Sequence, residues 1–388
     1  MLTTYNKHDT TQTNGQKTGL YIGTMSGTSA DGLDIVIANI SDINKIELCF
    51  NYFIEYPRSI SSEIKRLQLA TINQDENHQQ ALSLLDDQLT KFYAEHILLA
   101  LDASKLPKQD IIAIGNHGQT ILHQPNNVNP FTLQICDGQK LSNLCNIPVI
   151  ADFRSADIRH GGQGAPLLPA LHAKVFHQHS PCAIVNIGGI ANTTLLTDQS
   201  TIGFDNGPGN TLMNAWIQKH TQKSFDDNGE WARSGKINKT LLNKLLNDPY
   251  FSLTAPKSTG QDYFNLEWLN AKLGDMSINN EDIQATLCEL TAVSIIKDIT
   301  NLNTKCSHIY ICGGGAKNVF LMERLQKRAM TLKVKSSADV GVDPDWIEAL
   351  GFAWLAFCHT SGIEGNVPSV TGARKEVVLG ELFSPANQ

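Results

Sequence analysis

The sequence predicts an α/β protein of two lobes, each built around a sheet of its own. Runs that are typical of strands alternate with runs that are typical of helices, which is the pattern of α/β folds. Two similar hairpins, at 21–40 and 183–196, each consist of a strand, a glycine-rich turn and a second strand. Because 388 residues are too many for one ordinary core, we expect two domains, and the repeated hairpin indicates a duplicated architecture with a ligand between the copies.

The first half of the chain supplies the elements of the first lobe. Apolar and β-branched runs predict strands at 20–23, 33–40, 47–54, 111–114, 131–135 and 149–150. Helical spacing of apolar residues predicts helices at 60–71, 78–102 and 138–145. The charged and glycine-rich run 152–166 breaks this regularity, so we place the crossover into the second lobe there.

The second half begins with a helix that starts at Pro166 and runs to about His179. After the hairpin, the run 203–210 is predicted to be a turn that opens a helix to about His220. Further helices are predicted at 236–247, 280–301, 318–330 and 344–360, and a strand at 308–312. The predicted parts are a disordered tail at 1–18, an N-terminal lobe at 19–165 with about 361–388, and a C-terminal lobe at 166–360.

Composition narrows the class of partner. The chain carries 31 basic and 38 acidic side chains, a net charge of −7, which argues against nucleic acid as the main partner. No apolar run approaches the roughly 20 residues of a membrane span, and residues 1–18 lack the apolar segment of a secretory signal. The eight cysteines form no C-x-x-C pair, which favours buried thiols in a reducing cytoplasm. The sequence leaves open whether the chain forms a homodimer.

The turn of the first hairpin, within YIGTMSGTSADGLDIVIANI at 21–40, holds more polar groups than a hairpin requires. Glycines let backbone N–H groups approach an anion closely, and four hydroxyls add donors. Asp31 and Asp34 would repel a bare phosphate, so they indicate a divalent metal, and Asp31 is the favoured ligand. We therefore predict a clamp for ATP and Mg²⁺, with a plain tight hairpin as the alternative. It is not a P-loop, because no Gly-Lys-Ser/Thr follows the glycines.

Two further glycine-rich segments are candidate nucleotide contacts. Gly188 and Gly189 form the turn of the second hairpin, and the strand at 308–312 leads into Gly313, Gly314 and Gly315. A strand, glycines and a helix N-terminus together are a standard place for a nucleotide phosphate or ribose.

Two acids are candidate catalytic residues. Asp205 lies between the apolar Phe204 and Asn206, where a carboxylate can simply cap the following helix. Because Asn206 could cap equally well, Asp205 would be available as the general base of a phosphotransferase. Glu348 lies in an apolar helix, where a half-buried acid needs a partner such as a metal or its water.

Polar residues in two other segments are candidates for substrate binding. The turn 115–120 combines imidazole, amide and hydroxyl groups, from His117, Gln119 and Thr120. Such groups suit a sugar, and a loop that hydrogen-bonds its own backbone is the equal alternative. The second segment carries charges of alternating sign, from Asp152, Arg154, Asp157 and Arg159. This pattern is typical of a salt-bridged surface loop, or of an arginine that holds a substrate carboxylate or phosphate.

Several runs together resemble one known family. They are GTMSGTSADGLD (23–34), GNHGQT (115–120), DFRSADIRHGGQGAPLLPALH (152–172), NIGGIANTTLL (186–196), FDNGPGN (204–210), PKSTGQDYFN (256–265), CGGGAKN (312–318) and PSVTGA (368–373). In this order they resemble the bacterial anhydro-N-acetylmuramic acid kinases, from about residue 20 to the end. The chain departs from the family run FDTGPGN at Asn206, where threonine is common.

The resemblance implies the two-lobed, actin-like ATPase fold, with ribonuclease H-like repeats and ATP in a central interlobe cleft. It also implies an unusual reaction in which water opens the 1,6-anhydro bridge while ATP phosphorylates the freed 6-oxygen. The product is N-acetylmuramic acid 6-phosphate, an intermediate of cell-wall recycling. Opening an internal acetal in this way needs a base for water and a means of capturing the departing oxygen.

The resemblance also implies roles for individual residues. Asp205 matches the base that acts on the attacking water, and Glu348 matches a glutamate linked to the metal and ATP. The predicted ATP-binding set comprises Gly27, Thr28, Ser29, Ala30, Asp31, Gly32, Leu33, Asp34, Gly188, Gly189, Gly313, Gly314 and Gly315. The predicted substrate-binding set comprises His117, Gln119, Thr120, Asp152, Arg154, Arg159 and Asn210, and the predicted metal ligands are Asp31 and Glu348. Either Arg154 or Arg159 is expected to bind the lactyl carboxylate.

Two other functions fit parts of the same sequence. An ordinary N-acetylhexosamine kinase would use the same ATP-binding turns without opening a ring. A binding module of the actin or chaperone branch would hydrolyse ATP slowly, independently of sugar, and would act on a protein client.

Overall fold

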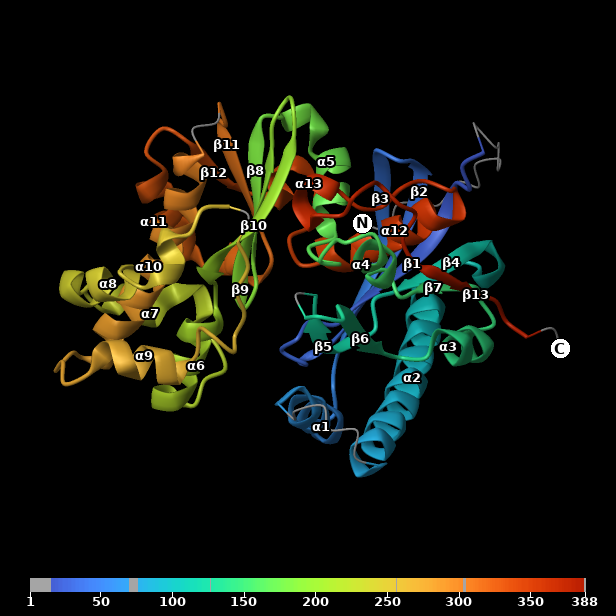
Figure 1. Ribbon diagram of the computed structural model, residues 1–388, viewed down its shortest axis with the longest axis horizontal. Helices are drawn as coiled ribbons and strands as arrows, with labels where there is room; N and C mark the ends of the chain where they lie inside the picture. Colours follow the sequence, from blue (N-terminus) through green and yellow to red (C-terminus); the bar gives the residue numbers. More distant parts are fainter. Residues whose placement is uncertain (1–14, 70–75, 126, 256, 303–304, 387–388) are drawn as a thin grey trace. The chain divides into compact units, whose positions relative to one another are not determined.

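The computed structural model of the chain describes residues 15–69, 76–125, 127–255, 257–302 and 305–386 (Figure 1). The chain folds into two compact units. Unit 1 comprises Met1–Val175 and Glu348–Gln388, and unit 2 comprises Phe176–Ile347. Residues 1–14 of the predicted disordered tail lie outside the described residues. From Lys17 onward the chain is held, because the Lys17 N–H donates to Ser361 Oγ at 3.0 Å.

Unit 1 is built on a mixed sheet in the order β13-β7-β4-β1-β2-β3. Its strands are β1 (Gly19–Met25), β2 (Gly32–Asp42), β3 (Lys45–Glu55), β4 (Ile111–Asn116), β7 (Val149–Ala151) and β13 (Glu381–Phe383), and a separate hairpin joins β5 (Gln119–Gln124) and β6 (Phe131–Ile135). Its helices are α1 (Arg58–Leu69), α2 (Glu76–Ser104), α3 (Gly138–Cys145), α4 (Ser155–Arg159), α5 (Leu168–Val175), α12 (Ile347–Thr360) and α13 (Pro368–Thr371). One face of the sheet packs its isoleucines and leucines against α1, α2 and α3.

Unit 2 repeats this plan, with a sheet in the order β10-β9-β8-β11-β12. Its strands are β8 (Cys182–Ile187), β9 (Ile190–Leu196), β10 (Thr201–Pro208), β11 (His308–Cys312) and β12 (Lys333–Ser336). Its helices are α6 (Thr211–Thr221), α7 (Glu230–Ser234), α8 (Lys239–Leu246), α9 (Leu266–Leu273), α10 (Asn280–Asn301) and α11 (Val319–Ala329). The core lies between the sheet and these helices, with the long α10 at its centre.

The strand pairing confirms that the architecture is duplicated. In unit 1, β1, β2 and β3 are antiparallel neighbours, and β1 pairs in parallel with β4, which pairs in parallel with β7. In unit 2, β8, β9 and β10 are antiparallel neighbours, and β8 pairs in parallel with β11, which pairs in parallel with β12. This common order is that of two ribonuclease H-like sheets, as the actin-like ATPase fold requires. The central interlobe cleft stays a prediction.

The helix α12 lies on the free face of the unit 1 sheet because two glycines make room for it (Figure 1). A Cβ atom on Gly23 of β1 would overlap the carbonyl oxygen of Ala349, and one on Gly115 of β4 would overlap that of Phe352. Small residues on the helix, Ala353 among them, complete the close approach. The lack of a side chain at Gly23 therefore serves the packing of α12.

Helix α5 also packs on α12, since Leu168 and Leu171 lie against Gly351. This contact places α5 in unit 1, whereas the sequence boundary at 165/166 assigns it to the second lobe. The other boundary falls at 347/348 rather than at 360/361, because α12 covers the unit 1 sheet.

Several local predictions are confirmed and others are wrong. The helices predicted at 138–145 and 280–301 are α3 and α10, and the helix predicted at 60–71 is α1, with its last two residues outside the described residues. The run 203–208 is not a turn but belongs to strand β10, and the run predicted to be irregular at 152–166 contains helix α4. None of the eight cysteines forms a disulfide, and seven are buried. No helix among the described residues has the length and apolar character of a membrane span.

Candidate active site

The turn of the first hairpin is held in shape from beneath by Gln119. The Ser26 hydroxyl donates to Gln119 Oε1 at 2.7 Å, and Gln119 Nε2 donates to the carbonyl oxygen of Gly27 at 3.1 Å. Gln119 is fully buried. Because these contacts occupy both ends of its amide, Gln119 acts on the turn, whereas the sequence analysis assigned it to the sugar.

The glycines of this turn have different tasks. A Cβ atom on Gly32 would overlap the carbonyl oxygen of Ile54, so the pairing of β2 with β3 requires glycine there. Gly27, which precedes the exposed Thr28 in the turn, has room for a side chain. Since Ala30 and Leu33 are buried in the core, only their backbone groups are available to a ligand.

The three acids predicted near the metal occupy different positions in unit 1. Asp31 is exposed at the end of the turn, and its carbonyl oxygen accepts a hydrogen bond from the Tyr56 N–H at 3.0 Å. Asp34 pairs with Met25 and alternates with the core residue Leu33, so it lies on the sheet face that α12 covers. Glu348 is half-buried on α12, next to the residue that meets Gly23. Asp34 and Glu348 therefore share one face of the sheet.

The structure distinguishes the two candidate arginines. Arg154 is half-buried, and its guanidinium donates to the carbonyl oxygen of Gly164 and to His117 Nε2, both at 2.8 Å. Burial lowers the pKa of Arg154 to about 10, and the negative charge of Glu348 opposes this shift. Burial and the charge of Arg154 hold the pKa of His117 well below its usual range, so the imidazole is neutral and can accept the N–H. Arg159 is exposed on α4.

A cavity of about 570 Å³ in unit 1 brings His117 and Asp152 together. Asn116, Gln134 and Ser155 add further hydrogen-bonding groups to its wall. Gln119, Thr120, Arg154 and Arg159 do not line this cavity, and the Thr120 hydroxyl accepts a hydrogen bond from Gln134 at 3.2 Å.

The charged run 152–159 is not a salt-bridged surface loop. Asp157 is fully buried, and its carboxylate accepts hydrogen bonds from Asn366 and Thr371, both at 2.7 Å, and from the Gly164 N–H at 2.8 Å. Asp157 therefore links residues 162–164 to the C-terminal part of unit 1.

In unit 2, three glycine-containing segments meet at the ends of β8 and β11. The N–H of Asn210 donates to the carbonyl oxygen of Gly188, and Asn210 Nδ2 donates to that of Ile187 at 3.1 Å. Gly313 has a positive φ of 72° and lies against Asn186, while a Cβ atom on Gly188 or Gly314 would meet only one neighbouring atom, at 3.8 and 3.7 Å respectively. Asn210 therefore organises the second turn. Helix α11 begins only after a short 3-10 turn, with Asn318 as its cap.

Asp205 lies in the middle of β10, not at the mouth of a helix as predicted. A bulge separates it from Gly207, where φ is 131°, so the run of glycines that indicated a turn instead bends a strand. The Thr259 N–H donates to Asp205 Oδ2 at 3.0 Å, and the Tyr250 hydroxyl donates to the carbonyl oxygen of Asp205 at 2.8 Å. Burial raises the pKa of the Asp205 carboxyl to about 6, although the Thr259 hydrogen bond and the charge of Lys257 lower it. Such a value is well matched to a general base near neutral pH.

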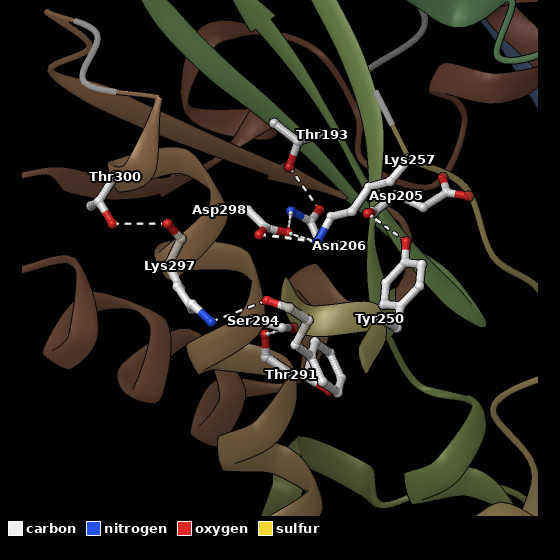
Figure 2. Close-up of polar contacts among 11 residues, drawn as sticks. Thr193, Asp205, Asn206, Tyr250, Lys257, Thr291, Ser294, Lys297, Asp298 and Thr300 are labelled. Atoms are coloured by element: carbon white, nitrogen blue, oxygen red, sulfur yellow. Dashed lines mark hydrogen bonds and ion pairs between the residues drawn. The ribbon is translucent and has the colours of Figure 1, made fainter. Parts of the chain in front are cut away.

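Asn206 does not cap the following helix. It is fully buried, its Oδ1 accepts from the Thr193 hydroxyl at 2.7 Å, and its Nδ2 donates to Asp298 Oδ2 at 3.2 Å (Figure 2). Asparagine at this position is therefore part of a hydrogen-bonded network behind Asp205.

Comparison with known proteins decides the family. Residues 19–385 match the family described as anhydro-N-acetylmuramic acid kinase. The chain belongs to this family.

Relatives that carry the name anhydro-N-acetylmuramic acid kinase cover nearly the whole chain. The protein of Pasteurella multocida (strain Pm70) is 44% identical over 372 residues, which are 95% of this chain and 97% of the relative. That of Haemophilus influenzae (strain ATCC 51907 / DSM 11121 / KW20 / Rd) is 43% identical, over 94% of this chain and 97% of the relative. That of Shewanella loihica (strain ATCC BAA-1088 / PV-4) is 45% identical, over 95% and 99%. The enzyme is thus a kinase, a phosphotransferase with an alcohol acceptor.

Kinases commonly bind ATP together with Mg²⁺, and the donor set of unit 1 fits that ion. Among the described residues no cluster of three or more His, Cys, Asp or Glu side chains forms a metal cage. Mg²⁺ is commonly held by one or two carboxylates together with substrate phosphates and water. Glu348 provides one such carboxylate. Asp31, or Asp34 on the same sheet face as Glu348, provides the second.

The sequence analysis missed the residues that surround Asp205 in this kinase. Tyr250 and Thr259 contact Asp205 directly, and Lys257 and Asp298 form a buried ion pair beside it (Figure 2). One signal was available, because the run PKSTGQDYFN at 256–265 was recognised as a family motif without a role for its lysine. Asp298 lies within a long helix and gave no signal.

The raised pKa of Asp205 predicts that this carboxylate lowers the stability of the kinase. An acid whose pKa rises from 3.8 to about 6 on folding stabilises the native state below pH 4, and that contribution is lost as the pH rises through 6. We therefore expect Asp205→Asn to raise the free energy of unfolding by about 1–2 kcal/mol at pH 8, after allowance for partial exposure. At pH 4 the two proteins should be equally stable. Urea denaturation at both pH values measures this, and an equal difference at both would contradict it.

Proposed function

We propose that this kinase opens the anhydro ring of 1,6-anhydro-N-acetylmuramic acid with water and transfers the γ-phosphoryl group of ATP to the freed 6-oxygen. The products are N-acetylmuramic acid 6-phosphate and ADP, which places the reaction in peptidoglycan recycling. Membership of the family over residues 19–385 and the names of the relatives support this substrate. An ordinary N-acetylhexosamine kinase and an ATP-switched binding module are not favoured by that membership.

The position of Asp205 is the observation that carries the mechanism. Its carboxylate is half-buried and has a pKa of about 6, so it is ionised at neutral pH and still basic enough to accept a proton. In the proposed step Asp205 takes a proton from water, and the water oxygen bonds to the anomeric carbon. The bond from that carbon to the 6-oxygen breaks, and its electron pair goes to the 6-oxygen, which bonds to the γ-phosphorus as ADP leaves. A single carboxylate is sufficient because the phosphoryl group captures the leaving oxygen.

We assign the phosphates of ATP to the glycine-rich turns. The first turn offers backbone N–H groups and the hydroxyls of Thr28 and Ser29, and in unit 2 Gly188 and Gly314 leave room for close approach. When Mg²⁺ is bound, it neutralises charge on the phosphates, and Glu348 with Asp31 or Asp34 would hold it. We place the enzyme in the cytoplasm, where ATP is available.

Arg154 is our choice for the lactyl carboxylate of the sugar. Its Nε has no hydrogen-bond partner among the described residues, although it is buried, so one N–H of a fixed guanidinium is available to an acceptor. His117 and Gly164 hold the rest of the group in place. Arg159 is exposed, which makes it less suited to selective recognition.

A labelling experiment tests the proposed reaction. With ATP, Mg²⁺ and 1,6-anhydro-N-acetylmuramic acid in ¹⁸O-labelled water, we expect a sugar 6-phosphate signal in the phosphorus NMR spectrum. After a quenched single turnover the label should be at the anomeric hydroxyl and absent from the phosphate. A control with preformed N-acetylmuramic acid 6-phosphate corrects for anomeric exchange. Phosphorylation of N-acetylglucosamine at a similar rate, or label in inorganic phosphate alone, would contradict the proposal.

A further inference from the structure

A buried ion pair lies beside the strand that carries Asp205. Lys257 Nζ is 2.9 Å from Asp298 Oδ2, and their side chains are only 3% and 10% exposed. Asp298 comes from the last turn of α10, and Lys257 comes from the segment that runs along β10 (Figure 2). The Lys257 ammonium also lies 4.8 Å from the centre of the Tyr250 ring, whose hydroxyl donates to the main chain of Asp205.

The pair is connected to Asp205 from both sides. On one side, the Asp205 N–H donates to the carbonyl oxygen of Lys257 at 2.9 Å, and two residues later the Thr259 N–H donates to the Asp205 carboxylate. On the other side, the neighbouring Asn206 donates to Asp298. Asp298 thus joins the residue after Asp205 to the segment that holds its carboxylate.

Stability alone gives little reason for such a pair. Two charges lose their hydration on burial, and apolar side chains of similar volume often serve a core as well or better. Its position next to a half-buried carboxylate indicates another task, because the charge of Lys257 also acts on Asp205.

We propose that Lys257 and Asp298 are positioning residues for Asp205, which fix the segment that holds its carboxylate and set the charge that the carboxylate experiences. This inference rests on the proposed role of Asp205 as the base. The charge of Lys257 favours the ionised form of the Asp205 carboxyl group. Asp298 weakens this effect because its own charge neutralises that of Lys257.

Other ionisable groups lie around Asp205 and the ion pair. Burial raises the pKa of Tyr250 far above its usual range, so its hydroxyl stays neutral and acts as a donor. Lys297 is a second cation near Asp298, and its ammonium donates to the carbonyl oxygen of Phe251 at 3.1 Å. Burial raises the pKa of Asp298 above its usual range, although the hydrogen bond and the charge of Lys257 oppose this shift.

Two substitutions should shift the pH dependence of the reaction in opposite directions. Lys257→Met removes the favourable cation, so the acid limb of kcat/KM for the sugar, measured at saturating MgATP, should move up by about one pH unit. Asp298→Asn leaves Lys257 without its counter-charge, so the limb should move down by about half a unit. The double variant should return the limb close to that of the wild type, while its kcat stays about 10-fold or more below, because the segment has lost its anchor.

A comparison variant separates this role from a merely structural one. Arg324→Met breaks another ion pair of unit 2, in which Arg324 Nε lies 2.5 Å from a fully buried Glu289 carboxylate, away from Asp205. It should lower the thermal midpoint without moving the acid limb. If Lys257→Met and Asp298→Asn also left the limb in place, or moved it in the same direction, the proposal would be overturned.

A second measurement does not depend on activity. Carboxyl ¹³C NMR of protein labelled at aspartate, with the Asp205 signal assigned from Asp205→Asn, gives the pKa of Asp205 directly in each variant. The same opposite shifts are expected there, and their absence would overturn the inference even if a variant were inactive. If the shifts occurred but wild-type enzyme made no sugar phosphate, the proposed function would fail and the electrostatic coupling would stand.

Discussion

Replacement of Asp205 by asparagine is expected to lower kcat of the kinase by roughly 10²–10⁴-fold, the usual contribution of a general base. The substitution keeps the size of the side chain and an oxygen that can accept from the Thr259 N–H, which now lies 3.0 Å from Oδ2. What it removes is the group that accepts the proton of water. Because the glycine-rich turns are unchanged, the Kd for ATP should stay within about twofold of the wild-type value. Steady-state kinetics and calorimetric titration with nucleotide measure the two quantities.

Asp198→Asn is a matched control for this result. Asp198 is exposed in the turn between β9 and β10, so the same chemical change is made in the same hairpin without touching the site. Its kcat should equal that of the wild type. Near-normal turnover of Asp205→Asn, or an equal loss in both variants, would exclude Asp205 as the base.

The second large effect is expected on stability, from Gly115→Ala in β4. The added methyl group would overlap the carbonyl oxygen of Phe352, a backbone atom of α12 that cannot move unless the helix shifts. Overpacking of this kind typically costs 1–3 kcal/mol, and because the obstacle is backbone we expect about 3 kcal/mol or more. The loss should appear in the chemical denaturation of unit 1, since both β4 and α12 belong to that unit.

Gly27→Ala provides the comparison for Gly115→Ala. A methyl group at Gly27 would meet only the Ser29 hydroxyl, at 3.5 Å, and the backbone there does not require glycine. Its free energy of unfolding should therefore match that of the wild type within about 0.5 kcal/mol. Similar stability of all three proteins would show that α12 does not depend on the glycine in β4.

Much of the fold was predictable because its signals are local. Apolar and β-branched runs identified the strands of the first hairpin, and the helix predicted at 280–301 is α10, at the same residues. The repeated hairpin then indicated the duplication, which the matching strand orders confirm. The family and the reaction were indicated by the combination of motifs rather than by any one of them.

The remainder depends on contacts between residues that are distant in sequence. Strand β10 was missed because Gly207 and Pro208 are typical of turns, while its pairing with β9 is not visible locally. The amide of Gln119 is a group that suits a sugar, but it holds the first turn from nearly a hundred residues away. The role of Asp298 could not be inferred for the same reason, since its partners Asn206 and Lys257 come from other parts of the chain.

The division of the chain has a practical consequence. Unit 2 is a single uninterrupted stretch of the chain, residues 176–347. Unit 1 consists of two stretches, and α12, which follows unit 2 in the sequence, packs on the sheet of unit 1. A protein fragment of residues 176–347 would therefore contain every hydrogen-bond partner described for Asp205. Such a fragment would allow the protonation chemistry of the carboxylate to be studied by spectroscopy in isolation from turnover, whereas truncation after residue 347 would strip the other sheet of its covering helix.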